Sequence, residues 1–106
     1  MWRVCSEPFM NDKYIFPTQQ RDVYKIIEEC KKDENITKVI IFGSSVTSLC
    51  NPWSDIDVYM EMKEEKLMPV FRLEVPVDKW NNFMVDEDLM EEINEKGVIV
   101  YERDVV

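Results

Sequence analysis

Apolar residues recur at helical spacing in two segments of this chain. The spacing in residues 19–33 predicts an amphipathic helix, with Thr18 available as its N-cap. The spacing in residues 87–96 predicts a second helix, with Asp86 as N-cap and Gly97 at its C-terminal end. The apolar positions that define the two faces are Val23, Ile26, Ile27, Cys30, Leu89, Met90 and Ile93.

Four other segments have the pattern of extended chain. Residues 38–42 are a short β-branched run, and residues 55–62 begin with strict alternation of polar and apolar side chains. Residues 71–83 form another extended stretch, interrupted by Pro76, and residues 98–101 form a last short strand. This order of helices and strands predicts an α/β or α+β fold, with one small mixed sheet and its helices packed on one face.

The length of 106 residues fits a single domain. Two prolines interrupt residues 1–17, so we expect an irregular N-terminal arm followed by one domain over residues 18–106. Neither a long apolar run nor the pattern of a signal peptide is present in the sequence, so we expect a cytoplasmic protein with no membrane segment. The three cysteines form no C-x-x-C pair, which is typical of reduced thiols.

The charge is strongly acidic, with 13 basic and 22 acidic residues and a net charge of −9. That balance argues against a nucleic-acid-binding surface, which needs positive charge to neutralise phosphates. Residues 86–106 alone hold 8 acidic and 2 basic residues, either as a solvated helix face or as a surface for a basic partner. The chain has no histidine, which excludes Ser-His-Asp and Cys-His mechanisms.

One stretch carries candidate chemistry. Gly43-Ser44 follows the β-branched run, and nine residues later comes Ser54-Asp55-Ile56-Asp57. On a strand, Asp55 and Asp57 project to the same side, where their charges repel unless a cation lies between them. Hard cations such as Mg²⁺ take oxygen ligands, and a Gly-Ser turn offers N–H groups and a hydroxyl to phosphate. The stretch therefore indicates metal-assisted chemistry on a nucleotide phosphate.

A two-metal site usually needs a third carboxylate. The candidates are Glu61, Glu74 and Asp78. If the strand carrying Asp57 paired with residues 73–80 as an antiparallel hairpin, Asp78 would lie across from Asp57. Glu61 would lie too far along its strand and Glu74 too near the turn, so Asp78 is the preferred third ligand.

The sequence resembles the polymerase-β-like nucleotidyltransferase superfamily in its small single-domain form, the minimal nucleotidyltransferase. Phe42-Gly43-Ser44 and Asp55-Ile56-Asp57-Val58 resemble its signature, and Pro76-Val77-Asp78 resembles the segment that carries its third aspartate. Residues 91–102 resemble its acidic C-terminal helix and last strand. The resemblance runs from about residue 19 to residue 102.

The resemblance implies transfer of AMP from ATP to an acceptor hydroxyl with two Mg²⁺ ions. It assigns the metal and catalytic roles to Asp55, Asp57 and Asp78, and the nucleotide to Gly43, Ser44 and Ser54. In this scheme Asp55 and Asp57 hold both ions. Asp78 binds the ion nearest the acceptor and helps to deprotonate its hydroxyl.

Minimal members of the family resemble the antitoxin half of two-protein modules, which implies adenylylation of a tyrosine on a helical HEPN toxin. Two alternatives stay open. Ser45 stands where many small members carry arginine, which favours a catalytically degenerate binding module. The other alternative is a small-molecule nucleotidyltransferase, such as an antibiotic modifier, that acts as an oligomer.

Overall fold

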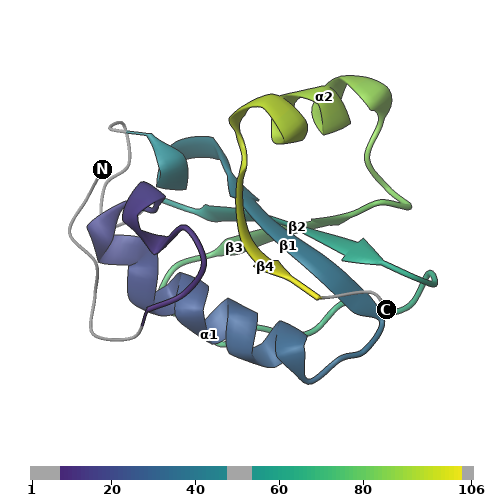
Figure 1. Cartoon of the computed structure of the whole chain (residues 1–106), viewed down its shortest axis with the longest axis horizontal. Coiled ribbons are helices and arrows are strands. Elements are labelled where there is room, and N and C mark those ends of the chain that lie inside the picture. The colour runs from purple at the N-terminus through teal and green to yellow at the C-terminus, as the bar shows by residue number, and fades with distance from the viewer. Residues whose placement is uncertain (1–7, 48–53, 104–106) are drawn as a thin grey trace.

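The computed structural model describes residues 8–47 and 54–103, and a four-stranded sheet lies at its centre (Figure 1). The strands are β1 (Ile36–Phe42), β2 (Ile56–Met62), β3 (Val77–Asn81) and β4 (Val98–Glu102). Their order across the sheet is β3-β2-β1-β4. β1 pairs antiparallel with β2 and with β4, whereas β2 and β3 are parallel. The mixed sheet and the α+β class expected from the sequence are confirmed.

The two predicted helices are present as α1 (Gln20–Lys31) and α2 (Glu87–Lys96). α2 has the predicted cap, because Oδ1 of Asp86 accepts a hydrogen bond of 2.8 Å from the backbone N–H of Leu89. The expected cap of α1 is wrong. Thr18 lies inside a 3₁₀ turn, η2 (Pro17–Gln19), and no side chain caps the helix. A turn of 3₁₀ helix leads directly into α1, so Thr18 has no extended N-cap geometry.

The two helices cover opposite faces of the sheet, with α1 below and α2 above it in Figure 1. Alternate residues of β1 point to each face: Val39 and Ile41 join the core under α1, and Ile40 and Phe42 join the core under α2. The expectation of helices on one face is therefore wrong. The central strand β1 is apolar on both faces, and each face needs a helix to bury it.

The connection between β2 and β3 is a crossover, so the antiparallel hairpin predicted from the sequence is wrong. Residues 63–76 return over the α1 face to the starting end of β2 before β3 begins. Parallel neighbours need such a crossover, and a connection of this length supplies it without a helix. Met68, Phe71, Leu73 and Val75 of the crossover pack on the core under α1.

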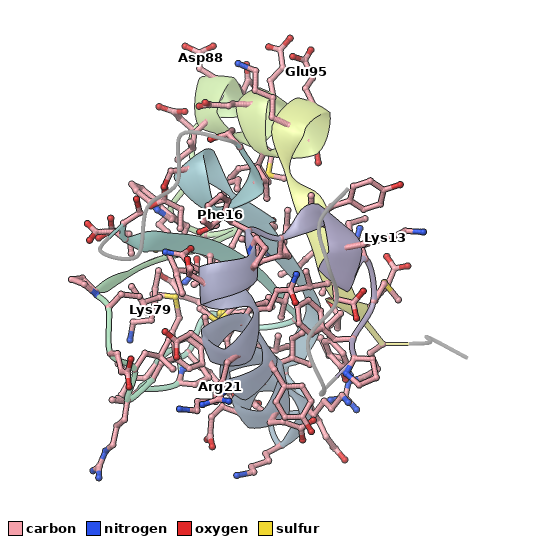
Figure 2. The ribbon with its side chains drawn as sticks, turned by 90° about the vertical axis from the view of Figure 1, so that its left-hand side faces the viewer. Lys13, Phe16, Arg21, Lys79, Asp88 and Glu95 are labelled. Atoms are coloured by element: carbon pink, nitrogen blue, oxygen red, sulfur yellow. The ribbon has the colours of Figure 1, made fainter. Side chains whose placement is uncertain are left out.

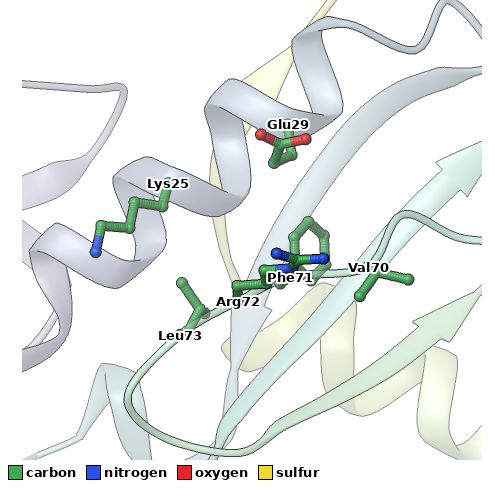
Figure 3. A pocket seen from close by; sticks show the side chains of 6 residues that line it. All are labelled: Lys25, Glu29, Val70, Phe71, Arg72 and Leu73. Carbon is green, nitrogen blue, oxygen red and sulfur yellow. The ribbon is translucent and has the colours of Figure 1, made fainter.

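A pocket of about 260 Å³ lies between α1 and this crossover (Figure 3). Lys25 and Glu29 line it from the helix, and residues 70–73 line it from the crossover. The pocket is on the α1 face of the sheet. The sheet therefore separates this pocket from the core under α2.

Residues 8–17 lie against the sheet and α1. They contain one 3₁₀ turn, η1 (Asp12–Tyr14), followed by Ile15, which is fully buried in the core. Nδ2 of Asn11 donates a hydrogen bond of 2.8 Å to the carbonyl of Ile99 on the edge strand β4. The boundary between an arm and a domain at residue 17 stays a prediction. In the part of the chain described, no helix has the length and apolar character needed to cross a membrane.

Candidate functional site

Asp57 and Asp78 lie side by side on neighbouring strands. In the parallel register of β2 and β3 they are direct partners, and on its other side Asp57 pairs with Phe42 of β1. Tyr59 and Trp80, two residues further along each strand, belong to the core under α2. Because side chains alternate along a strand, both carboxyl groups lie on the α2 face. The predicted pairing of Asp57 with Asp78 is thus present, although the strands run in the same direction.

The surroundings of Asp57 disfavour its negative charge. Burial, the charge of Asp78 and a hydrogen bond with Asp78 raise the pKa of Asp57 to about 6. Smaller contributions in the same direction come from Asp55 and from Glu92 on α2. Within the described residues, every charged group that shifts this pKa is acidic. Asp57 therefore keeps a proton or needs a cation, and no cationic side chain of the described residues lowers its pKa.

Gly43 is packed against the carboxyl group of Asp57. Its φ of 75° lies in the left-handed region that favours glycine, and a Cβ built on it would collide with Oδ2 of Asp57. Gly43 opens a short 3₁₀ turn, η3 (Gly43–Val46), in which the carbonyl of Ser44 accepts a hydrogen bond of 3.0 Å from the N–H of Thr47. The residue pattern of 44–50 predicts a short helical turn; residues 44–46 belong to η3, and residues 48–50 lie outside the described residues.

Ser54 and Asp55 lead into β2 next to this turn. The carbonyl of Ser54 accepts a hydrogen bond of 2.6 Å from Nε2 of Gln19. Asp55 is exposed immediately before the strand, and its charge adds to the rise in the pKa of Asp57. All three predicted aspartates are thus near one another. Asp57 and Asp78 are in direct contact, and Asp55 lies just before β2, close enough for its charge to act on Asp57.

The sequence interpretation did not assign Gln19 to the site, although it lies between two parts of it. Gln19 is 1% exposed, and its Oε1 accepts a hydrogen bond from Oγ of Ser45, which is fully buried. In the sequence, Gln19 is marked simply as one of two adjacent glutamines at the start of the predicted amphipathic helix. Ser45 occupies the position where many small members of the resembled family carry arginine. Its side chain points to Gln19.

The donor set suits a hard divalent cation. Within residues 8–47 and 54–103, no three His, Cys, Asp or Glu side chains converge as a ready cluster for an ion. Two carboxyl groups in contact, with a third within electrostatic range, nevertheless provide the oxygen ligands that Mg²⁺ prefers. An ion between Asp57 and Asp78 would relieve the repulsion that raises the pKa of Asp57.

The comparison with protein families agrees with this geometry. The sequence model described as "Nucleotidyltransferase domain" matches residues 23–106. The matched region contains Gly43, the turn that follows it and all three aspartates. No curated protein shows a significant match to the chain.

Proposed function

The chain belongs to the nucleotidyltransferase domain family, and from that premise we propose that it transfers AMP from ATP to a hydroxyl group on a partner protein. One observation carries the proposal. Asp57 and Asp78 are in contact on one face of the sheet, directly beside the glycine of a tight turn, and no cationic side chain offsets them within the described residues. Such an arrangement is suited to a metal-bound triphosphate.

In the proposed reaction, the acceptor oxygen attacks the α-phosphorus of ATP. A new O–P bond forms to the acceptor, the bond between the α-phosphorus and the bridging oxygen breaks, and pyrophosphate leaves with that electron pair. The acceptor hydroxyl loses its proton as it attacks. Asp78 is exposed on the edge strand β3, so it is the carboxylate that an incoming hydroxyl reaches, and we assign it the proton.

We assign two Mg²⁺ ions to Asp55, Asp57 and Asp78. When bound, the ions would supply the positive charge that the attacking and leaving oxygens need. Asp57 fits the shared ligand, because it lies on the inner strand β2 between Asp78 and the glycine turn. Gly43 and Ser44 would present their N–H groups to the β- and γ-phosphates, and we assign Ser54 to nucleotide binding as well.

The surface around α2 supports a protein as the acceptor. Asp88 and Glu95 project outward from this helix in Figure 2, and it exposes further acidic side chains at Glu87, Glu91 and Glu92. Just before α2, Phe83 and Met84 are exposed large apolar residues. A partner with a basic surface and an apolar contact would fit here. A helical HEPN toxin, adenylylated on tyrosine by an antitoxin in the cytoplasm, is the partner class we propose.

A second candidate, a degenerate module that binds its partner without catalysis, is favoured by one specific feature. Ser45 is neutral, so it offers no positive charge to a triphosphate, and its hydroxyl donates its hydrogen bond to Gln19. In this alternative the acidic α2 surface still binds a basic partner, but Mg²⁺ and nucleotide are not needed.

Labelling distinguishes the two candidates. Purified protein, Mg²⁺ and α-³²P-ATP are incubated with lysate of the source cell or with the product of the neighbouring gene, and the proteins are separated on a gel. We expect a labelled band with the wild type and none with Asp57→Asn. Glu61→Gln is the matched control, because Glu61 lies on the same strand outside the acidic group around Asp57.

The same reaction with γ-³²P-ATP serves as a chemical control. Nucleotidyl transfer leaves the γ-phosphate in pyrophosphate, so this label should give no band. A band with the γ label would indicate phosphoryl transfer instead. No band with either label, in the presence of a partner that binds the protein, would favour the degenerate module.

A further inference from the structure

Gln19 joins the two segments that carry the proposed nucleotide site. Its Oε1 accepts a hydrogen bond from Oγ of Ser45 in the turn after β1, and its Nε2 donates one of 2.6 Å to the carbonyl of Ser54 before β2. A backbone hydrogen bond also holds Ser45 in place. The N–H of Phe16, labelled in Figure 2, donates a hydrogen bond of 2.8 Å to the carbonyl of Ser45. One buried amide thus spans the gap between turn and strand.

The two attachments lie next to the residues proposed to act. Ser45 follows Gly43 and Ser44, and Ser54 directly precedes Asp55. In the described part of the chain, the β1–β2 register ends at the pair of Phe42 and Asp57, before it reaches Ser45 and Ser54. A glutamine amide whose nitrogen donates and whose oxygen accepts has a fixed orientation. Leaving either buried atom without a hydrogen bond would cost stability.

The adjacent Gln20 can be compared directly with Gln19 in burial and in hydrogen-bond partners. Both side chains are 1% exposed, and both donate hydrogen bonds to backbone carbonyls. Nε2 of Gln20, however, donates to the carbonyls of Asp12 and Ile15, at 3.2 Å and 2.9 Å, and so holds the N-terminal segment. Among the described residues, these bonds of Gln19 reach the candidate site, whereas these bonds of Gln20 reach the N-terminal segment.

We propose that Gln19 is a positioning residue for the nucleotide. Its amide sets the distance between the phosphate-binding turn at Gly43 and Ser44 and the carboxylate at Asp55. The inference rests on the proposed function. It also explains why Ser45 is buried: its hydroxyl is used to hold the turn and is not directed at the ligand. Small errors in such spacing weaken binding and transfer strongly.

The test compares Gln19→Met with Gln20→Met. Each change keeps the length of the side chain and removes one buried amide, so we expect similar losses of thermal stability. Binding of Mg²⁺ with a non-hydrolysable ATP analogue is measured by calorimetry at a temperature where both variants are folded. We expect Gln19→Met to bind about tenfold more weakly than the wild type, and Gln20→Met to bind within about twofold of it.

A second variant keeps the test valid if Gln19→Met does not fold. Ser45→Ala leaves Gln19 in place and removes only the hydroxyl that donates to its Oε1, so it should also weaken binding, by less than Gln19→Met. Hydrogen exchange gives a readout that needs no ligand. Amides of residues 43–47 and 54–57 should exchange faster in Gln19→Met and in Ser45→Ala and remain unchanged in Gln20→Met.

The outcomes separate the two levels of the account. If the wild type binds the nucleotide and Gln19→Met binds it as tightly as Gln20→Met does, the positioning role is wrong and the proposed function stands. If the wild type binds no better than Asp57→Asn, the proposed function is wrong, and the role of Gln19 in nucleotide binding is overturned with it.

Discussion

Asp57 and Asp78 are register partners on parallel strands, and burial together with this contact raises the pKa of Asp57. The inner carboxyl group is half-buried on β2, and the outer one is exposed on the edge strand β3. Two like charges in this position are a cost to the folded protein that a bound cation can remove. Stability, pH and metal binding should therefore be linked through this pair.

The first prediction follows from that linkage. The pKa of Asp57 rises from 3.8 to about 6 on folding, so the folded chain binds a proton more tightly than the unfolded chain. Stability is therefore lost as the pH rises through this range. Asp57→Asn should remove this contribution, of about 1–2 kcal/mol after solvent screening. Urea unfolding of both proteins at about pH 4 and about pH 7 checks it. Parallel pH dependences in the two proteins would contradict the assignment.

The effect of Mg²⁺ should change with pH in the opposite direction. At about pH 7.5 Asp57 is ionised, and Mg²⁺ should raise the melting temperature of the wild type. At about pH 5 Asp57 holds a proton, and the same Mg²⁺ concentration should have a smaller effect. Asp57→Asn should respond little at either pH. A thermal shift of equal size in wild type and variant would place the ion elsewhere on the acidic surface.

Gly43→Ala should damage both the fold and the site. The alanine would adopt an unfavourable φ, and its Cβ would collide with Oδ2 of Asp57, so the carboxyl group must move. Gly97→Ala is the matched control, because its Cβ would also collide, with the carbonyl of Ile93 and with Ile40 and not with an aspartate. Both should lose about 1–3 kcal/mol of stability. Nucleotide binding per folded molecule should fall in Gly43→Ala alone.

The cap of α2 gives a prediction that concerns stability only. Oδ1 of Asp86 satisfies the N–H of Leu89, so Asp86→Ala should lose about 1 kcal/mol, and Asp86→Asn should lose much less. Asp88→Ala removes an acid from the same turn without removing the cap and is the control. Chemical denaturation measures all three. An equal loss in Asp86→Ala and Asp88→Ala would indicate a charge effect rather than a cap.

Cys30 should be inert in the folded protein. Its side chain is fully buried, and burial, with smaller effects from Asp33 and Glu29, raises its pKa to about 12. In a chain carrying Cys5→Ser and Cys50→Ser, a thiol reagent should react at Cys30 only after denaturant is added. Mass spectrometry of the labelled protein checks this. Rapid labelling under native conditions would show that the core under α1 opens.

Much of this fold could be predicted from local patterns. The helical spacing located α1 and α2, the short apolar runs located β1 and β4, and Asp86 was correctly identified as a cap. Strand direction could not be predicted, because the same pair of Asp57 and Asp78 satisfies both an antiparallel hairpin and a parallel crossover. Residues 63–76 contain no helix to indicate a crossover, so sequence spacing alone favoured the hairpin.

The candidate site shows the same division. The positions of Gly43 and the three aspartates follow from spacing, since each is identified by its own place on a strand or turn. Gln19 acts through partners 26 and 35 residues away in the chain, Ser45 and Ser54. A buried glutamine of this kind has no periodic signature, so tertiary contacts had to identify it.

The central claim is that the pair of Asp57 and Asp78 binds Mg²⁺ for a nucleoside triphosphate. Its most direct test is calorimetric titration with a non-hydrolysable ATP analogue, with and without Mg²⁺. The account predicts Mg²⁺-dependent binding that is retained in Glu61→Gln and lost in Asp57→Asn and Asp78→Asn. Binding that persists in both aspartate variants, or no binding by the wild type, would contradict it.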